Sequence, residues 1–198
     1  RLTLEEDQIE RQCGVGKHLL IHLIERRLLR ADPRTGSTYY ELSHDTLVVP
    51  ILRDRDERDP DAVVRSADAE RISGNYSTAI GLYERAVKLQ PSNVLANVQW
   101  ATTLTQVGRF EEAAGVLTTA VKRGVRHESL HHLLGRIYAA KGNQKTAIEQ
   151  YAEALKLNDS LATAHADLAA AYRDDKQPDN AVRYYERSIA LDPQNAQT

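Results

Sequence analysis

The sequence has no methionine and only one cysteine, Cys13, among its 198 residues. One thiol excludes a disulfide within the chain and fits a reducing, cytoplasmic setting. No apolar run approaches the ~20 residues of a membrane helix. The net charge of −2 gives no sign of a nucleic-acid or membrane partner. Because the chain starts at Arg1 and lacks methionine, we expect it to be a piece of a longer protein.

What the chain does have is a period of 34 residues through its last two-thirds. Small, bulky and glycine residues recur in phase, with no insertion or deletion. The small series are Ala79, Ala113, Ala147 and Ala181; Ala67, Ala101, Gly135 and Ala169; and Ala86, Ala120, Ala154 and Ser188. The bulky series is Tyr83, Leu117, Tyr151 and Tyr185, and the glycine series is Gly74, Gly108 and Gly142.

Each series predicts a structural role. Small residues fit where two helices cross closely, bulky ones fill the space between successive hairpins, and glycine suits the left-handed backbone that follows a helix. Pro91 and Pro193 stop the second helix of a unit. The expected helices span 61–73, 77–89, 94–107, 111–123, 128–141, 145–157, 162–175 and 179–191.

This pattern resembles the tetratricopeptide repeat family. The resemblance covers four repeats, at 60–93, 94–127, 128–161 and 162–195. It implies a mainly α fold, a right-handed α-solenoid with a concave face. Lys176 replaces the turn glycine of the last repeat, and Val125 and Asp159 stand where proline is usual. These departures change turn details and leave the fold intact.

The N-terminal 59 residues follow a different pattern. We expect a polar helix at 3–13, a largely apolar and buried helix at 17–31, a loop at 32–37 and a strand at 38–42. A further helix is expected after Ser43, kinked at Pro50. This order predicts a small winged-helix domain in residues 1–59.

The segments LIERRLLR and YYELSHDTLVVPILRDRDER resemble the winged-helix domain of signal-transduction ATPases with numerous domains (STAND ATPases). In that family a His-Asp pair follows a Glu-Leu strand, and here it is His44-Asp45. The resemblance implies that His44 senses the phosphates of bound ADP in a longer parent protein, where ATP or ADP would be the cofactor. The pair could equally be a simple helix start. The family serves in bacterial signalling, defence and cell death, and often ends in a repeat sensor.

Candidate chemical motifs are incomplete. The segment Gly14–Lys17 lacks the earlier glycine and the following Ser or Thr of a phosphate-binding loop. The three histidines His127, His131 and His132 lack a cysteine or paired carboxylate to complete a metal site. No nucleophile and base occur in a supporting context. We therefore expect no catalysis, cofactor or metal in this chain itself.

The concave face is the expected binding site, because ligands of this repeat family lie against the first helix of each unit. The residues expected there are Asp68, Arg71, Val98, Thr102, Thr105, Gln106, His132, Arg136, Arg173 and Asp174. They vary between repeats while the packing residues recur, although drift on any exposed surface gives the same pattern. Three arginines suit a ligand with carboxylate groups, and the two aspartates make the surface mixed.

Our interpretation is the sensor region of a STAND-type ATPase, in which the groove binds a protein trigger and the winged helix relays binding to the nucleotide site. One alternative is a transcription regulator whose winged helix binds DNA, which the apolar helix at 17–31 disfavours. Another is a plain assembly scaffold. We also expect self-association through Val182, Tyr185 and Ile189 of the fourth hairpin.

Overall fold

The computed structural model describes residues 3–5, 29–34, 37–42 and 59–193. The chain divides into two compact units, Arg1–Ala62 and Val63–Thr198. Within the described residues, no helix is both long and apolar enough to cross a membrane. Each unit is considered by itself below.

The first unit contains a three-stranded antiparallel sheet with the order β1-β3-β2. Its strands are β1 (Thr3–Glu5), β2 (Leu29–Arg34) and β3 (Ser37–Leu42). The pairing of β2 with β3 runs from Leu29 opposite Leu42 to Arg34 opposite Ser37. On its other edge β3 pairs with β1, where Leu4 is opposite Tyr40. A segment near the start of the given sequence thus pairs with a strand, β3, that lies more than thirty residues later.

The strand expected at 38–42 is confirmed, but three other expectations for this unit are wrong. Residues 3–5 form a strand where we expected a helix, and 29–31 belong to β2 where we expected the end of a helix. Residues 32–34 continue β2 where we expected a loop. These residues form strands because they pair with β3, which supplies their backbone hydrogen bonds. Such pairing cannot be predicted from the pattern of neighbouring residues in the sequence. The other expected elements of this region lie outside the described residues.

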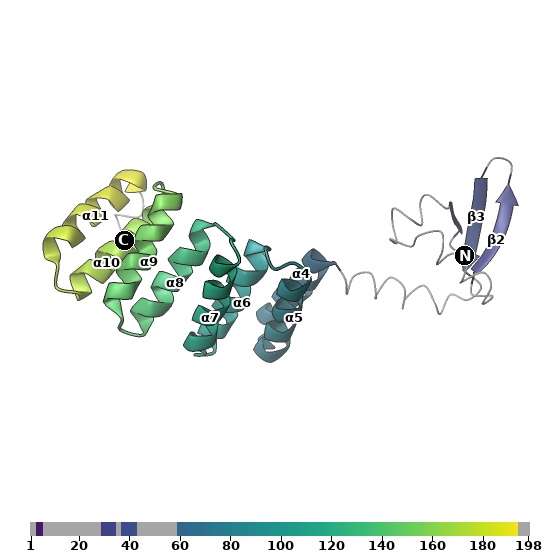
Figure 1. Cartoon of the computed structure of the whole chain (residues 1–198), viewed down its shortest axis with the longest axis horizontal. Helices are drawn as coiled ribbons and strands as arrows, with labels where there is room; N and C mark the ends of the chain where they lie inside the picture. The colour runs from purple at the N-terminus through teal and green to yellow at the C-terminus, as the bar shows by residue number, and fades with distance from the viewer. Residues whose placement is uncertain (1–2, 6–28, 35–36, 43–58, 194–198) are drawn as a thin grey trace. The chain divides into compact units, whose positions relative to one another are not determined.

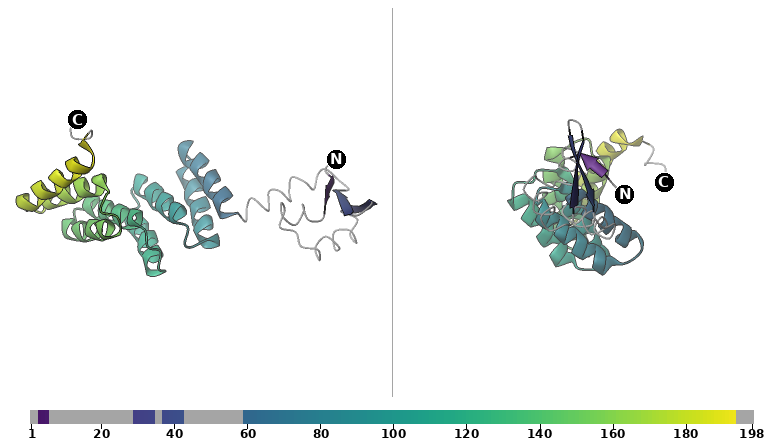
Figure 2. Two further views of the ribbon diagram at one scale, coloured as in Figure 1. Left: turned by 90° about the horizontal axis from the view of Figure 1, so that it is seen from above. Right: turned by 90° about the vertical axis from the view of Figure 1, so that its right-hand side faces the viewer.

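The second unit is built from helical hairpins stacked side by side (Figures 1 and 2). The helices are α4 (Pro60–Ile72), α5 (Tyr76–Leu89), α6 (Val94–Gln106), α7 (Phe110–Lys122), α8 (Glu128–Ala140), α9 (Gln144–Leu157), α10 (Ala162–Asp174) and α11 (Pro178–Leu191). Every expected helix is present, and each begins and ends within one residue of its predicted bounds.

The turn inside each hairpin has the same geometry. Gly74, Gly108 and Gly142 have φ of 82°, 80° and 76°, and Lys176 takes the same place with φ 63°. In each turn the second residue after the helix's C-cap donates its N–H back across the turn, as Asn75 does to the carbonyl of Glu70 at 2.8 Å. The conformation is therefore imposed by the hairpin, and Lys176 adopts it without the freedom of glycine.

The core of the unit confirms the roles of the small and bulky series. Ala67, Ala79, Ala101, Ala113 and Ala147 are fully buried. The third repeat shows why one of these positions must be small. A Cβ on Gly135 would come within 2.5 Å of the Tyr151 ring, a distance that real Cβ contacts do not reach. The close crossing of α8 and α9 therefore requires glycine at this position.

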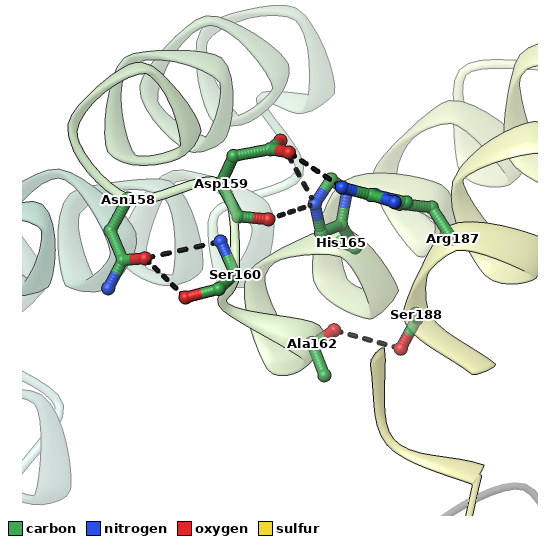
Figure 3. A network of polar contacts seen from close by, with 7 residues as sticks. All are labelled: Asn158, Asp159, Ser160, Ala162, His165, Arg187 and Ser188. Carbon is green, nitrogen blue, oxygen red and sulfur yellow. Dashed lines mark hydrogen bonds and ion pairs between the residues drawn. The ribbon is translucent and has the colours of Figure 1, made fainter. Parts of the chain in front are cut away.

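Two of the three linkers between hairpins are held by a similar contact from the first helix that follows them. The buried side chain of Asn97 donates to the Pro91 carbonyl at 3.1 Å, and His165, two periods later, contacts the Asp159 carbonyl at 2.9 Å. Figure 3 shows that Asp159 also binds Arg187 of α11, at 2.9 Å. The linker with aspartate in place of proline is therefore held by side-chain contacts.

The first helices of the hairpins approach one another. Helix α8 contacts both α6 and α10, its counterparts in the neighbouring hairpins. Contacts between successive first helices place them on the inner side of a curved stack. The expected ligand residues all lie on the first helices, α4, α6, α8 and α10.

Candidate ligand groove

The inner surface carries a polar cluster in the first repeat. The hydroxyl of Tyr83 donates to Oδ1 of Asp68 at 2.5 Å, and Nε of Arg71 donates to the same hydroxyl at 3.4 Å. Arg71 and Asp68 also form an ion pair at 3.6 Å. Burial, and then the bond to Asp68, raises the pKa of Tyr83 to about 12. Asp68 and Arg71 therefore neutralise each other's charge, and both are hydrogen-bonded to the Tyr83 hydroxyl.

The fourth repeat has a related arrangement. Nη1 of Arg173 lies 3.5 Å from the hydroxyl of Tyr185, a pair placed three periods after Arg71 and Tyr83. The Arg173 guanidinium also binds the carboxylate of Asp174 at 2.9 Å. The bond to Asp174 raises the pKa of the Arg173 guanidinium. Both groups are exposed, so this pair is open to solvent and to screening.

The third and fourth repeats are joined across the inner surface by His132 and Asp167. Nε2 of His132 on α8 and Oδ2 of Asp167 on α10 are 2.8 Å apart. The His132 ring lies 5.8 Å from the Tyr151 ring, tilted by 52°. Asp167 was absent from the sequence-based site. Asp167 lies 35 residues after His132, one residue more than the period of 34. This spacing could have indicated from the sequence that the two residues lie near each other on neighbouring first helices.

Arg136 differs from the other two arginines of the surface. It is exposed and makes no hydrogen bond or ion pair with any described residue. It stands two periods after Asp68, as Tyr151 stands two periods after Tyr83. The third repeat therefore places a cation where the first has a carboxylate.

The hydroxyl of Tyr151 has no hydrogen-bond partner among the described residues. Burial raises the pKa of Tyr151, the charge of Asp167 adds to the rise, and the charge of Arg136 opposes it. Both charges thus act on this phenol. The position equivalent to Arg71 is Ala139, so the third repeat also lacks the arginine that faces Tyr83. An acceptor for this phenol is missing from the described part of the chain.

The second repeat contributes an uncharged stretch. Thr105 donates to the Ala101 carbonyl of its own helix at 2.8 Å. Thr102 and Val98 are half-buried, and Gln106 at the end of α6 is exposed. This stretch separates the neutralised cluster of the first repeat from the His132–Arg136 region.

The three clustered histidines have separate partners. Nδ1 of His127 accepts from the Ser129 amide at 3.2 Å, and His131 contacts Gln150 at 3.0 Å, while His132 contacts Asp167. Over the residues described, no group of three or more His, Cys, Asp or Glu side chains could hold a metal ion. The expected nucleotide-sensing pair, His44 and Asp45, lies outside the described residues.

Comparison with protein families gives matches that run from residue 71 to residue 195. Models described as tetratricopeptide repeat match residues 71–137 and 162–195, and one described as TPR repeat matches 135–176. Together they span the region in which the sequence shows its period.

Curated relatives share part of their length with this chain. The Drosophila melanogaster BBSome complex member BBS4 homolog is 30% identical over 139 residues, 65% of this chain and 29% of that protein. Mouse DnaJ homolog subfamily C member 7 is 27% identical over 143 residues, 72% of this chain and 27% of that protein. The chain spans less than a third of the length of these relatives.

Solved structures of MamA share the fold. One, described as MamA, aligns with a TM-score of 0.64 at 18% identity, covering 74% of this chain and 86% of that one. MamA from Desulfovibrio magneticus RS-1, residues 41 to the end, aligns with a TM-score of 0.61 at 19% identity, covering 77% and 86%. At this identity the likeness concerns the fold alone.

Proposed function

We propose that this chain, whose residues 71–195 are tetratricopeptide repeats, binds a segment of another protein on its inner surface at His132, Arg136 and Tyr151. Tetratricopeptide repeats form protein-interaction scaffolds. The proposal adds where on the repeats the ligand binds and which chemical groups bind it.

The observation that carries the proposal is the unpaired charge of Arg136 beside an unpartnered phenol. In the first repeat, a carboxylate accepts from Tyr83 and faces an arginine. In the third repeat, the phenol and a cation are present and the carboxylate is missing. A ligand carboxylate would accept from Tyr151 and pair with Arg136, which can bind it through two N–H groups. Asp167 and His132 form the edge of this site toward α10.

The test is recovery of protein partners from the native host by immobilised chain. Wild type is compared with Arg136→Asp, and Arg126→Asp serves as the control because Arg126 is exposed and lies outside the helices. The proposal expects specific partners to be lost with Arg136→Asp and kept with Arg126→Asp. Equal recovery by all three proteins would place the binding surface elsewhere.

The same proposal extends to the parent protein as a STAND-type ATPase that uses this region as its sensor, in the cytoplasm. Support comes from the winged-helix resemblance around His44-Asp45 and from a small antiparallel sheet, which suits a wing. In this arrangement ligand binding by the repeats would be relayed to bound ADP. The chain itself would carry out no reaction.

The relay is tested in the full-length parent. An imidazole can donate a hydrogen bond to a phosphate, so His44→Ala is expected to release ADP faster and to raise basal signalling. Unchanged ADP retention and unchanged basal activity would contradict the relay. Such a result would leave the groove proposal standing, because groove binding is measured separately.

A further inference from the structure

A hollow of about 380 Å³ lies between the second helices of the first two hairpins, α5 and α7. Its walls include Val87 of α5 and Gly115 and Val116 of α7, and Trp100 of α6 also lines it. None of the groove residues His132, Arg136 and Tyr151 lines this hollow. It is therefore separate from the proposed groove site.

Two residues of the second repeat, Trp100 and Gly115, contribute to the hollow. Trp100 stands where later repeats have Leu134 and Leu168, which are 4% and 1% exposed. Trp100 is only partly buried, since the indole exceeds the space that leucine fills. Gly115 stands one period before Glu149, and a Cβ on Gly115 would meet nothing within 4 Å. A large aromatic wall and an absent side chain together leave open space.

The polar groups around the hollow are of two kinds. Nε1 of Trp100 has no hydrogen-bond partner and is buried, so it is not accessible from the hollow. On the rim, Lys88 and Glu84 neutralise each other at 2.7 Å. Arg123, at the end of α7, is exposed and makes no ion pair with a described residue. The group on the rim that is accessible and lacks a partner of opposite charge among the described residues is therefore the Arg123 guanidinium.

We propose that this hollow is a second ligand site, which takes a segment of a partner protein carrying an apolar side chain next to a carboxylate. The apolar side chain fills the space against Val87, Val116 and the indole. The carboxylate of the ligand pairs with Arg123. The positive rim favours an acidic ligand over a neutral or basic one.

The site can be measured directly, because Trp100 is the only tryptophan of the chain. The probe is N-acetyl-L-phenylalanine, which carries an apolar side chain and a carboxylate, and its amide, which lacks the charge, is the matched control. We expect a saturable change in tryptophan emission with the acid and at least tenfold weaker binding of the amide. No saturable change with the acid, or equal binding of acid and amide, would overturn the proposal.

Two variants test the location. Gly115→Glu introduces the residue found one period later and is expected to fill the hollow and abolish the response. Gly81→Glu is its control, because Gly81 is the equivalent glycine one period earlier, is also free of neighbours and does not line the hollow. Arg123→Gln is expected to remove the preference for the acid. An unchanged response in Gly115→Glu, with circular dichroism equal to Gly81→Glu, would contradict the assignment.

Discussion

Arg136 occupies in the third repeat the position that Asp68 occupies in the first, two periods of 34 residues earlier. Asp68 accepts a hydrogen bond from Tyr83 of its own repeat, whereas the positive charge of Arg136 opposes the rise that burial causes in the pKa of Tyr151 of its own repeat. The scaffold thus presents the same phenol in two electrostatic settings. One is satisfied within the chain, and the other is open to a ligand.

This difference predicts unequal effects of the same substitution. Tyr83→Phe removes the donor to Asp68 and the acceptor from Arg71, both part-buried, and should lower the free energy of unfolding by about 1 kcal/mol. Tyr151→Phe removes no hydrogen bond within the described residues and should change it by less than about 0.5 kcal/mol. Urea unfolding of both variants measures the difference. Equal losses would show that Tyr151 also has an internal partner.

The close contact of Gly135 with Tyr151 predicts that even one methyl group is too large there. Gly135→Ala should destabilise the protein by about 1–3 kcal/mol through overpacking. Gly115→Ala is the control, since its Cβ meets no neighbour and alanine favours a helix by about 1 kcal/mol. Thermal unfolding should move in opposite directions for the two variants. A rise in melting temperature for Gly135→Ala would refute the packing account.

The helices of the second unit could be predicted from the sequence almost to the residue, because the same local pattern recurs and each repeat confirms the next. The first unit has no such redundancy. The run that includes Leu28 and Leu29 satisfies a helix or a strand, and the choice of strand for Leu29–Arg34 depends on pairing with β3.

Side-chain partners of the candidate site were harder to predict than its position. The sequence placed Arg71, Arg136 and Arg173 on one surface. The sequence could not show that Arg71 pairs with Asp68 and Arg173 with Asp174, because these ion pairs depend on side-chain rotamers. The contact of His132 with Asp167 joins two hairpins and follows from the stacking geometry rather than from either helix.

The linker between the third and fourth hairpins predicts an acid-sensitive contribution to stability. The bond from Arg187 lowers the pKa of the Asp159 carboxyl below its ordinary value of 3.8. A group whose pKa is lower in the folded state stabilises the fold above its unfolded pKa and loses that contribution as pH falls. Wild type should therefore lose more stability than Arg187→Gln between pH 7 and about pH 3. Urea midpoints at both pH values test this, and identical losses would contradict it.

The exposed apolar side chains of α11 predict weak self-association. Val182 and Ile189 are 56% and 49% exposed, and Tyr185 beside them is half-buried. An apolar face of this kind gains free energy when a second copy covers it. Sedimentation at rising concentration should show a dimer for wild type and a monomer for Val182→Asp with Ile189→Asp. A wild type that stays monomeric at the highest concentration would count against this interface.

The most direct test of the account is the affinity of the recovered partner segment for wild type and for Arg136→Asp, measured by calorimetry at fixed ionic strength. Loss of a charge-assisted bond of ~1.5–3 kcal/mol predicts at least tenfold weaker binding by Arg136→Asp. The same loss of affinity should follow when the ligand's carboxylate is replaced by its amide. Little further loss is expected when the amide ligand is measured against Arg136→Asp. Equal affinity of wild type and Arg136→Asp for that segment would contradict the claim that the third repeat supplies the ligand site.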